Sequence, residues 1–150
     1  MGWGAQAASL LDAFLRRLRA EWRVARRDSF AARGADGRKY PWGDAKPSTQ
    51  VCWDGKGSDM GAGRRRGTCA VGAHPGGQSA FGLEDMAGNV WEWIADPYSP
   101  AYDQPPTDLR ILRGGTWFGY DREDLRSTLR MRMDARAHDY GIGFRCAKSI

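Results

Sequence analysis

Turn-forming residues constrain this chain more than any other feature of its sequence. Twenty glycines and seven prolines are spread over 150 residues. They are dense between positions 34 and 82, where the chain reads GADGRKYPWGD, then CWDGKGSDMGAGRRRG and GAHPGGQSAFG. Such density interrupts long helices and long strands. We therefore expect ordered loops without a further helix in this region, held in place by the aromatic rings of Trp42 and Trp53.

One segment has clear helical periodicity. Between residues 9 and 27 the apolar side chains fall on one helical face and arginines fill the other. The apolar face comprises Leu11, Phe14, Leu15, Leu18, Trp22 and Ala25. Such a helix can bind a membrane surface or a partner's groove, but packing against its own domain is the commoner outcome. We assign residues 1–29 to a basic amphipathic helix.

Composition and charge limit the class of protein. A chain that is 41% hydrophobic and 11% aromatic can form one domain with a modest core. The formal charge of +5 comes with arginine clusters near residues 16–27, 64–66 and 126–136. A solvated surface explains them more simply than nucleic acid does, because no nucleic-acid-binding motif accompanies them. The sequence has no long apolar run and no signal-like start, so it predicts a cytoplasmic protein without a membrane span.

The three cysteines, Cys52, Cys69 and Cys146, have no C-x-x-C spacing, which argues against a zinc site. A disulfide between Cys52 and Cys69 would require an oxidising compartment.

The last third of the chain has strand patterns. LRILRGGTWF alternates like a strand and is broken at Gly114 and Gly115, where a bulge or a close backbone approach is expected. Residues 125–133 alternate arginine with apolar or small residues, which predicts a half-buried strand. The segment IGFRCAK predicts a closing strand with Ile142, Phe144 and Cys146 on one face.

Several blocks together resemble one known family. These blocks are YPWGD (40–44), GLEDMAGNVWEW (82–93), LRGGTW (112–117), LRS (125–127) and GFRCA (143–147). Their order and spacing are similar to those of the formylglycine-generating enzymes, also called sulfatase-modifying factors. The resemblance covers residues 30–150 and corresponds to the later part of the family domain. It implies an α+β fold, a loop-rich variant of the C-type lectin fold with a small twisted antiparallel sheet, apparently truncated at its N-terminus.

The resemblance also implies a calcium site. In the family, the stretch matching DMAGNVWE wraps calcium, which assigns the carboxylates of Asp85 and Glu92 and the carbonyls of Gly88 and Val90 as ligands. Calcium prefers such oxygen donors. Glu92 alternates with two tryptophans, so in an extended segment the indoles would share a buried face opposite the acid. The alternative is that Glu92 pairs with an arginine or a loop amide and binds no ion. A second family calcium site is expected to be lost or remodelled, because Gln50 and Val51 stand where it needs an asparagine.

This sequence lacks the cysteine ligands that the family's copper site needs. The resemblance implies that two cysteines after GGTW should hold copper, but Gly119 and Asp124 stand at their approximate positions. Neither can replace a thiolate toward Cu(I). Cys146, in GFRCA, is expected to be buried in the core. Iron-dependent relatives use a histidine trio from an added domain, whereas this chain has only His74 and His138, interpreted as a loop and a surface histidine. Copper and iron are therefore not expected, and no catalytic residue is assigned.

The segment between GGTW and GFRCA instead suggests binding. In lectin-type folds this region faces solvent and forms ligand surfaces, and here it is rich in aromatic residues and arginine, as binding hot spots are. The alternative is that many of these side chains are buried or ion-paired. The candidate ligand-binding residues, called the loop surface below, are Trp117, Phe118, Tyr120, Arg122, Arg130, Arg132, Arg136, His138 and Tyr140.

The sequence therefore predicts a calcium-supported, non-catalytic module that binds a protein or a small ligand. The alternative is an oxidoreductase of the same superfamily with an unrecognised site. Exposed sheet edges further suggest that a second chain completes the sheet. Nucleic-acid binding through the basic helix ranks last.

Overall fold

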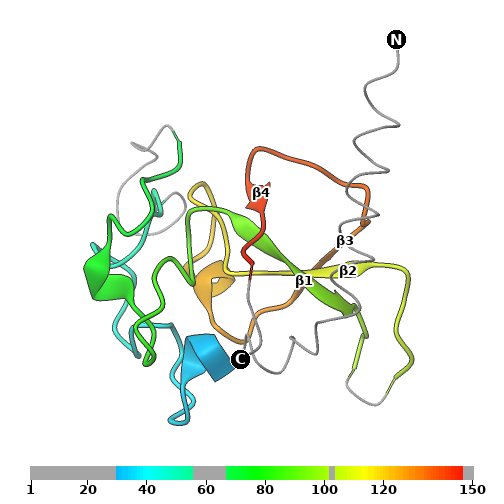
Figure 1. Ribbon diagram of the computed structural model, residues 1–150, viewed down its shortest axis with the longest axis horizontal. Helices are drawn as coiled ribbons and strands as arrows, with labels where there is room; N and C mark the ends of the chain where they lie inside the picture. Colours follow the sequence, from blue (N-terminus) through cyan, green and yellow to red (C-terminus); the bar gives the residue numbers. More distant parts are fainter. Residues whose placement is uncertain (1–29, 56–66, 102–103, 147–150) are drawn as a thin grey trace.

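A computed structural model describes residues 30–55, 67–101 and 104–146 of the chain (Figure 1). The predicted helix at residues 9–27 and the arginines at 64–66 lie outside these residues. In Figure 1 the loops that precede the sheet, blue to green, lie to the left, and the strands cross the centre and right. Within the described ranges, none of the helices has the length and apolar character needed to cross a membrane.

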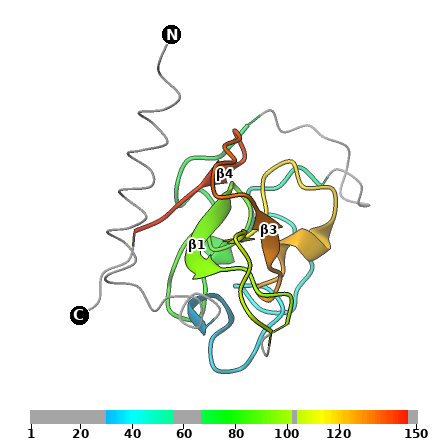
Figure 2. The same cartoon turned by 90° about the vertical axis from the view of Figure 1, so that its right-hand side faces the viewer.

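Four strands form one mixed sheet in the order β3-β2-β1-β4. The strands are β1 (Trp91–Pro97), β2 (Arg110–Arg113), β3 (Met131–Met133) and β4 (Ile142–Gly143). The pairs β1/β2 and β2/β3 are antiparallel, whereas β4 runs parallel to β1. Figure 2 shows β4 over the start of β1, where Trp91 pairs with Ile142. The sheet is therefore mixed rather than wholly antiparallel, and its few short strands in a loop-rich chain agree with the expected α+β, C-type-lectin-like fold.

The central strand β1 follows the predicted alternation only in part. Trp91 and Ile94 are buried, but Trp93 is half-buried, and the register with β2 shifts between Trp93 and Pro97. Beyond the end of β2, Gly114 and Gly115 have φ of 92° and 78°, in the left-handed region that favours glycine. The predicted interruption of the strand at these glycines is confirmed.

The core links the glycine-rich loops to the segment that follows β2. It comprises Tyr40, Val51, Trp53, Ala87 and Leu125, with the partly buried Trp42 packed against it. The rings of Tyr40 and Trp42 stack at 5.1 Å between centroids. Trp53 is buried and donates its indole N–H to the Gly119 carbonyl at 2.8 Å. Buried aromatic rings thus hold the loops in place, as the sequence predicts.

Helical structure in the described residues is limited to short pieces. Residues 30–33 are helical and end at Gly34, which has φ 66°. The 3-10 helix η1 (Pro75–Gly77) is a single turn in the loop region where no further helix was expected, and η2 (Arg122–Leu125) is a second short 3-10 helix.

The predicted strand at residues 125–133 is wrong in its first half. Asp121 caps η2 by accepting a hydrogen bond from the Glu123 N–H, and Leu125 ends the turn fully buried. The capped turn and the burial of Leu125 outweigh the local alternation of side chains, so strand pairing begins only at Met131.

The expected packing of the last strand is also wrong. Strand β4 ends at Gly143, and Phe144 and Cys146 are both exposed. Cys146 is therefore not a buried core residue. Two paired residues are too few to carry the predicted alternation of faces beyond the strand.

Candidate functional site

The loop at residues 85–92 turns tightly against the segment around Cys52. Asp85, Gly88 and Asn89 have φ of 53°, 75° and 61°, all in the left-handed region. A Cβ at Gly88 would collide with a methyl group of Val51 and would lie 2.7 Å from the Cys52 carbonyl oxygen. Only glycine fits this position.

Arg145 provides the partner of Glu92. Its Nε and Nη2 donate to the two carboxylate oxygens of Glu92 at 2.6 and 2.7 Å, which is a bidentate ion pair. The same guanidinium donates to the carbonyls of Glu84 at 3.0 Å and Asp85 at 2.7 Å. The Asp85 carboxylate accepts the Gly72 N–H at 2.8 Å. The arginine pairing weighed as an alternative for Glu92 is thus present.

The four predicted calcium ligands include Glu92, the acid that Arg145 binds. Asp85, Gly88 and Val90 lie in the tight turn before β1, and Glu92 is the second residue of β1. They offer carboxylate and carbonyl oxygens, the donors that calcium takes. Glu92, however, already has a cation on both of its oxygens. A calcium ion here would therefore have to share Glu92 with Arg145 or displace it.

Asn89 holds the two cysteine segments together. Its backbone N–H donates to the Cys52 carbonyl at 2.9 Å. Its side-chain oxygen accepts the Cys69 N–H at 3.1 Å, and its side-chain NH₂ donates to the Cys69 carbonyl at 3.4 Å. The Asn89 carbonyl in turn accepts the Trp117 N–H at 2.9 Å and the Thr116 hydroxyl at 3.3 Å. One residue thus connects both cysteines to the segment after β2.

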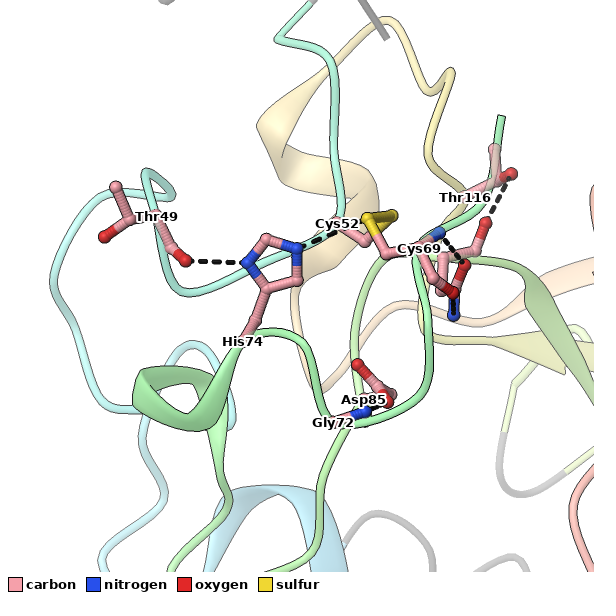
Figure 3. The surroundings of a disulfide bond; sticks show 8 residues. Thr49, Cys52, Cys69, Gly72, His74, Asp85 and Thr116 are labelled. Atoms are coloured by element: carbon pink, nitrogen blue, oxygen red, sulfur yellow. Dashed lines mark hydrogen bonds between the residues drawn. A yellow bond between two sulfur atoms is a disulfide. The ribbon is translucent and has the colours of Figure 1, made fainter. Parts of the chain in front are cut away.

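Cys52 and Cys69 form a disulfide, and His74 lies against it (Figure 3). The Nε2 atom of His74 lies 3.3 Å from the Cys69 sulfur, and its Nδ1 lies 2.8 Å from the Thr49 carbonyl oxygen. We call Cys52, Cys69 and His74 the sulfur–imidazole cluster. Disulfides are typical of oxidising compartments, so a cytoplasmic location stays a prediction.

The disulfide of this cluster was considered from the sequence, but the approach of His74 was not found. The cysteines are 17 residues apart and no C-x-x-C pair marks them. The available signal was weak: a histidine five residues after Cys69, followed by a Pro-Gly turn. Among His, Cys, Asp and Glu side chains of the described residues, this is the set close enough to hold a metal ion.

The positions assigned to the family's copper cysteines lie side by side. A Cβ at Gly119 would lie 3.4 Å from a carboxylate oxygen of Asp124. Burial raises the pKa of Asp124 and outweighs the hydrogen bond from the Asp121 backbone, which lowers it. The two positions are close enough for a shared ligand, but neither carries sulfur.

The loop surface divides into separate groups. Trp117, Phe118 and Tyr140 form an aromatic cluster, with ring centroids 5.0 Å apart for Trp117–Phe118, 4.9 Å for Phe118–Tyr140 and 6.4 Å for Trp117–Tyr140. Tyr140 is 73% exposed, whereas the other two rings are partly covered. Tyr140 is therefore the exposed ring of this cluster, and it lies against the partly covered rings of Trp117 and Phe118.

The arginines do not all join this cluster. Arg130 and Arg132 both lie over the ring of Tyr98, each 5.5 Å from its centroid, and Tyr98 was not among the predicted residues. No local pattern links Tyr98, just after β1, to these arginines, because β2 lies between β1 and β3 in the sheet. The remaining members are exposed, namely Tyr120, Arg122, Arg136 and His138.

Comparison with known proteins identifies the family. The chain matches the sulfatase-modifying factor enzyme 1-like domain over residues 17–150, and it belongs to this family. The solved structure of PvdO from Pseudomonas aeruginosa has a TM-score of 0.61 at 26% identity, over 79% of this chain and 48% of that one. Family and fold thus agree with the resemblance seen in the sequence blocks.

Curated relatives include both inactive and active proteins. "Inactive C-alpha-formylglycine-generating enzyme 2" of Mus musculus is 39% identical over 128 residues, which is 80% of this chain and 40% of that protein. "Hercynine oxygenase" of Mycolicibacterium smegmatis is 38% identical over 96 residues, 53% of this chain and 21% of that protein. The chain therefore spans less than half the length of these relatives.

Proposed function

We propose that this chain is a non-catalytic binding module of the sulfatase-modifying factor family. The observation that carries the proposal is the pair Gly119 and Asp124, which stand side by side where the family's copper cysteines are expected. An aspartate and a glycine offer no thiolate to Cu(I). The similarity to a relative named inactive supports the same conclusion.

A gain-of-ligand variant tests the loss of catalysis. Wild type and the double variant Gly119→Cys/Asp124→Cys are loaded with Cu(I) and incubated with a cysteine-containing peptide, while oxygen uptake and peptide mass are recorded. We expect no oxidation by wild type, and Cu(I) binding by the double variant because its two thiols would lie close together. Copper-dependent oxidation by wild type would instead favour the alternative, an oxidoreductase with an unrecognised site.

The ligand-binding role is assigned to the open part of the loop surface. Tyr140 and Tyr120 are 73% and 68% exposed, and the exposed Arg136 adds positive charge, whereas Arg122 lies 3.8 Å from the Glu123 carboxylate. Exposed tyrosine with arginine is the composition that binding hot spots use. We therefore propose that the ligands are peptides or small molecules with acidic groups.

Selection from a random peptide library tests this role. Wild type should enrich acidic peptides, and Tyr140→Ala should weaken their binding at least about tenfold, a loss of about 1.4 kcal/mol. Val71→Ser is the matched control, because Val71 is 86% exposed but belongs to the earlier loops. Equal enrichment by wild type and Tyr140→Ala would contradict the assignment.

We further propose that calcium supports the loop at residues 85–92, with Asp85, Gly88, Val90 and Glu92 as ligands. The turning of this loop and its oxygen donors support the proposal, while Arg145 competes for Glu92. Saturating calcium at about 100 times Kd should raise the free energy of unfolding by about 2.7 kcal/mol. Thermal unfolding with calcium and with a chelator measures this, and Asp85→Asn should remove most of the effect. Equal unfolding temperatures with calcium and with the chelator would contradict calcium binding by these residues.

Pairing with a second chain also stays a proposal. The edge strands β3 and β4 carry three and two residues and could accept further pairing. Size-exclusion chromatography with light scattering tests it, since a stable monomer at high concentration would exclude self-pairing.

A further inference from the structure

We propose that Cys52, Cys69 and His74 form a binding site for a thiophilic metal ion, zinc first, when the disulfide between the cysteines is reduced. This site shares no ligand with the loop surface or with the predicted calcium ligands, although Asn89 of the neighbouring turn contacts both cysteines, and it does not depend on the proposed function. Two thiolates and one imidazole are a donor set that zinc takes, with water in the fourth position of a tetrahedron.

The three ligand atoms already lie at suitable separations. All of them lie within 4.8 Å of one another. A nitrogen and a sulfur bound to one tetrahedral zinc ion lie about 3.6 Å apart, and the distance from His74 Nε2 to the Cys69 sulfur is 3.3 Å. Once the S–S bond is broken, rotation of the cysteine side chains has only to separate the sulfurs to about 3.8 Å.

The histidine is oriented as a ligand. The Thr49 carbonyl oxygen can only accept, so the 2.8 Å contact requires a proton on His74 Nδ1. In the neutral ring this leaves the lone pair on Nε2, which faces the Cys69 sulfur, as Figure 3 shows. A backbone carbonyl that fixes the tautomer of a metal-binding histidine is a common outer-shell arrangement.

The cysteines stay close together without their disulfide. Asn89 donates to the Cys52 carbonyl and exchanges two side-chain hydrogen bonds with the backbone of Cys69. Cys52 is 1% exposed, whereas Cys69 and His74 are half-buried. An ion would therefore enter from the Cys69 and His74 side, where the water ligand would also lie.

The change from disulfide to metal site needs a reductant, which we take to be a dithiol. It transfers two electrons and two protons: the S–S bond breaks, two thiols form, and the dithiol becomes a cyclic disulfide. Zinc then binds the two thiolates and releases both thiol protons. In the oxidised chain the sulfurs are bonded to each other, so zinc finds no thiolate.

Cobalt titration tests the site, using Cys146→Ser as the reference chain because Cys146 is an exposed free thiol. After reduction with a dithiol and its removal without air, we expect one Co²⁺ per chain with sulfur-to-cobalt charge-transfer absorption, and displacement by Zn²⁺. The oxidised chain should show no such absorption. A reduced chain without charge-transfer absorption would overturn the proposal.

Variants of the histidines separate a three-ligand site from two reactive thiols. His74→Ala keeps the disulfide and should weaken cobalt binding by more than the roughly 10- to 100-fold typical of losing an outer-shell partner. The control His138→Ala, at an exposed histidine, should bind like the reference. Equal affinity in His74→Ala and the reference would overturn the assignment of His74.

If reduction of the disulfide unfolds part of the chain, circular dichroism provides a second test. A site built from native geometry should then restore the native spectrum on addition of Zn²⁺, because binding and folding are coupled. A reduced chain that stays unfolded in excess Zn²⁺ would contradict the proposal.

Discussion

The loops before β1 and the segment after β2 are both irregular in structure, yet they are held by different means. The earlier loops are tied by Asn89, by the disulfide, by a glycine that admits no side chain, and by the buried rings of Tyr40 and Trp53. In the later segment Leu125 is buried in the core, whereas Tyr120 and Tyr140 are exposed to solvent. Irregular backbone can thus be rigid support in one region and a carrier of exposed side chains in another.

The largest effect is expected from Gly88→Ala. An alanine would be forced into φ 75° and against Val51 and the Cys52 carbonyl. Backbone strain and overpacking together should cost about 2–5 kcal/mol of unfolding free energy. Gly76→Ala is the matched control, because its Cβ would meet only a Gln50 side-chain atom at 3.8 Å. Chemical denaturation measures both, and similar losses would refute the tight approach at Gly88.

Asn89→Ala should have the next largest effect. It removes the side-chain hydrogen bonds with Cys69 and leaves partly buried backbone groups without that partner, which should cost about 2 kcal/mol. Tyr120→Ala, in the later segment, should change stability by less than about 0.5 kcal/mol because Tyr120 is 68% exposed. Equal losses of unfolding free energy for Asn89→Ala and Tyr120→Ala in urea denaturation would contradict the distinction between the two regions.

Asp124→Asn should have the smallest effect, and it should depend on pH. Burial raises the pKa of Asp124 in the folded chain, so the folded state binds this proton more tightly than the unfolded state does. Wild type therefore loses stability as the pH rises from the ordinary carboxyl pKa of about 3.9 through the raised value. The asparagine avoids this loss.

At neutral pH the asparagine variant should accordingly be more stable than wild type by less than about 1 kcal/mol, since Asp124 is partly exposed to solvent. The advantage should vanish below the ordinary pKa. Thermal unfolding of both chains at a series of pH values checks this, and a destabilised variant at neutral pH would contradict it.

The sequence predicted the fold through its blocks. The glycines at 114 and 115, the order of motifs and the aromatic anchors Trp42 and Trp53 could be read from the sequence, because each is a local or family-level signal. The strand at residues 125–133 was overextended, because alternation of arginine and apolar residues does not reveal that Leu125 is buried beneath a capped turn.

The site was predicted less completely, because its contacts join distant residues. Arginine pairing by Glu92 was foreseen only as an alternative, and its partner Arg145 could not be chosen among the many arginines. The approach of His74 to Cys69 depends on chain folding that no spacing rule describes.

The bidentate contact of Arg145 has a consequence for biosynthesis. The ribosome makes Glu92 53 residues before it makes Arg145. Until then the acidic turn has no access to the guanidinium that bridges Glu92 and the carbonyls of Glu84 and Asp85. The ion pair between Glu92 and Arg145 therefore forms late in synthesis. A chaperone or a metal ion that binds the turn earlier meets a Glu92 carboxylate that Arg145 does not yet contact.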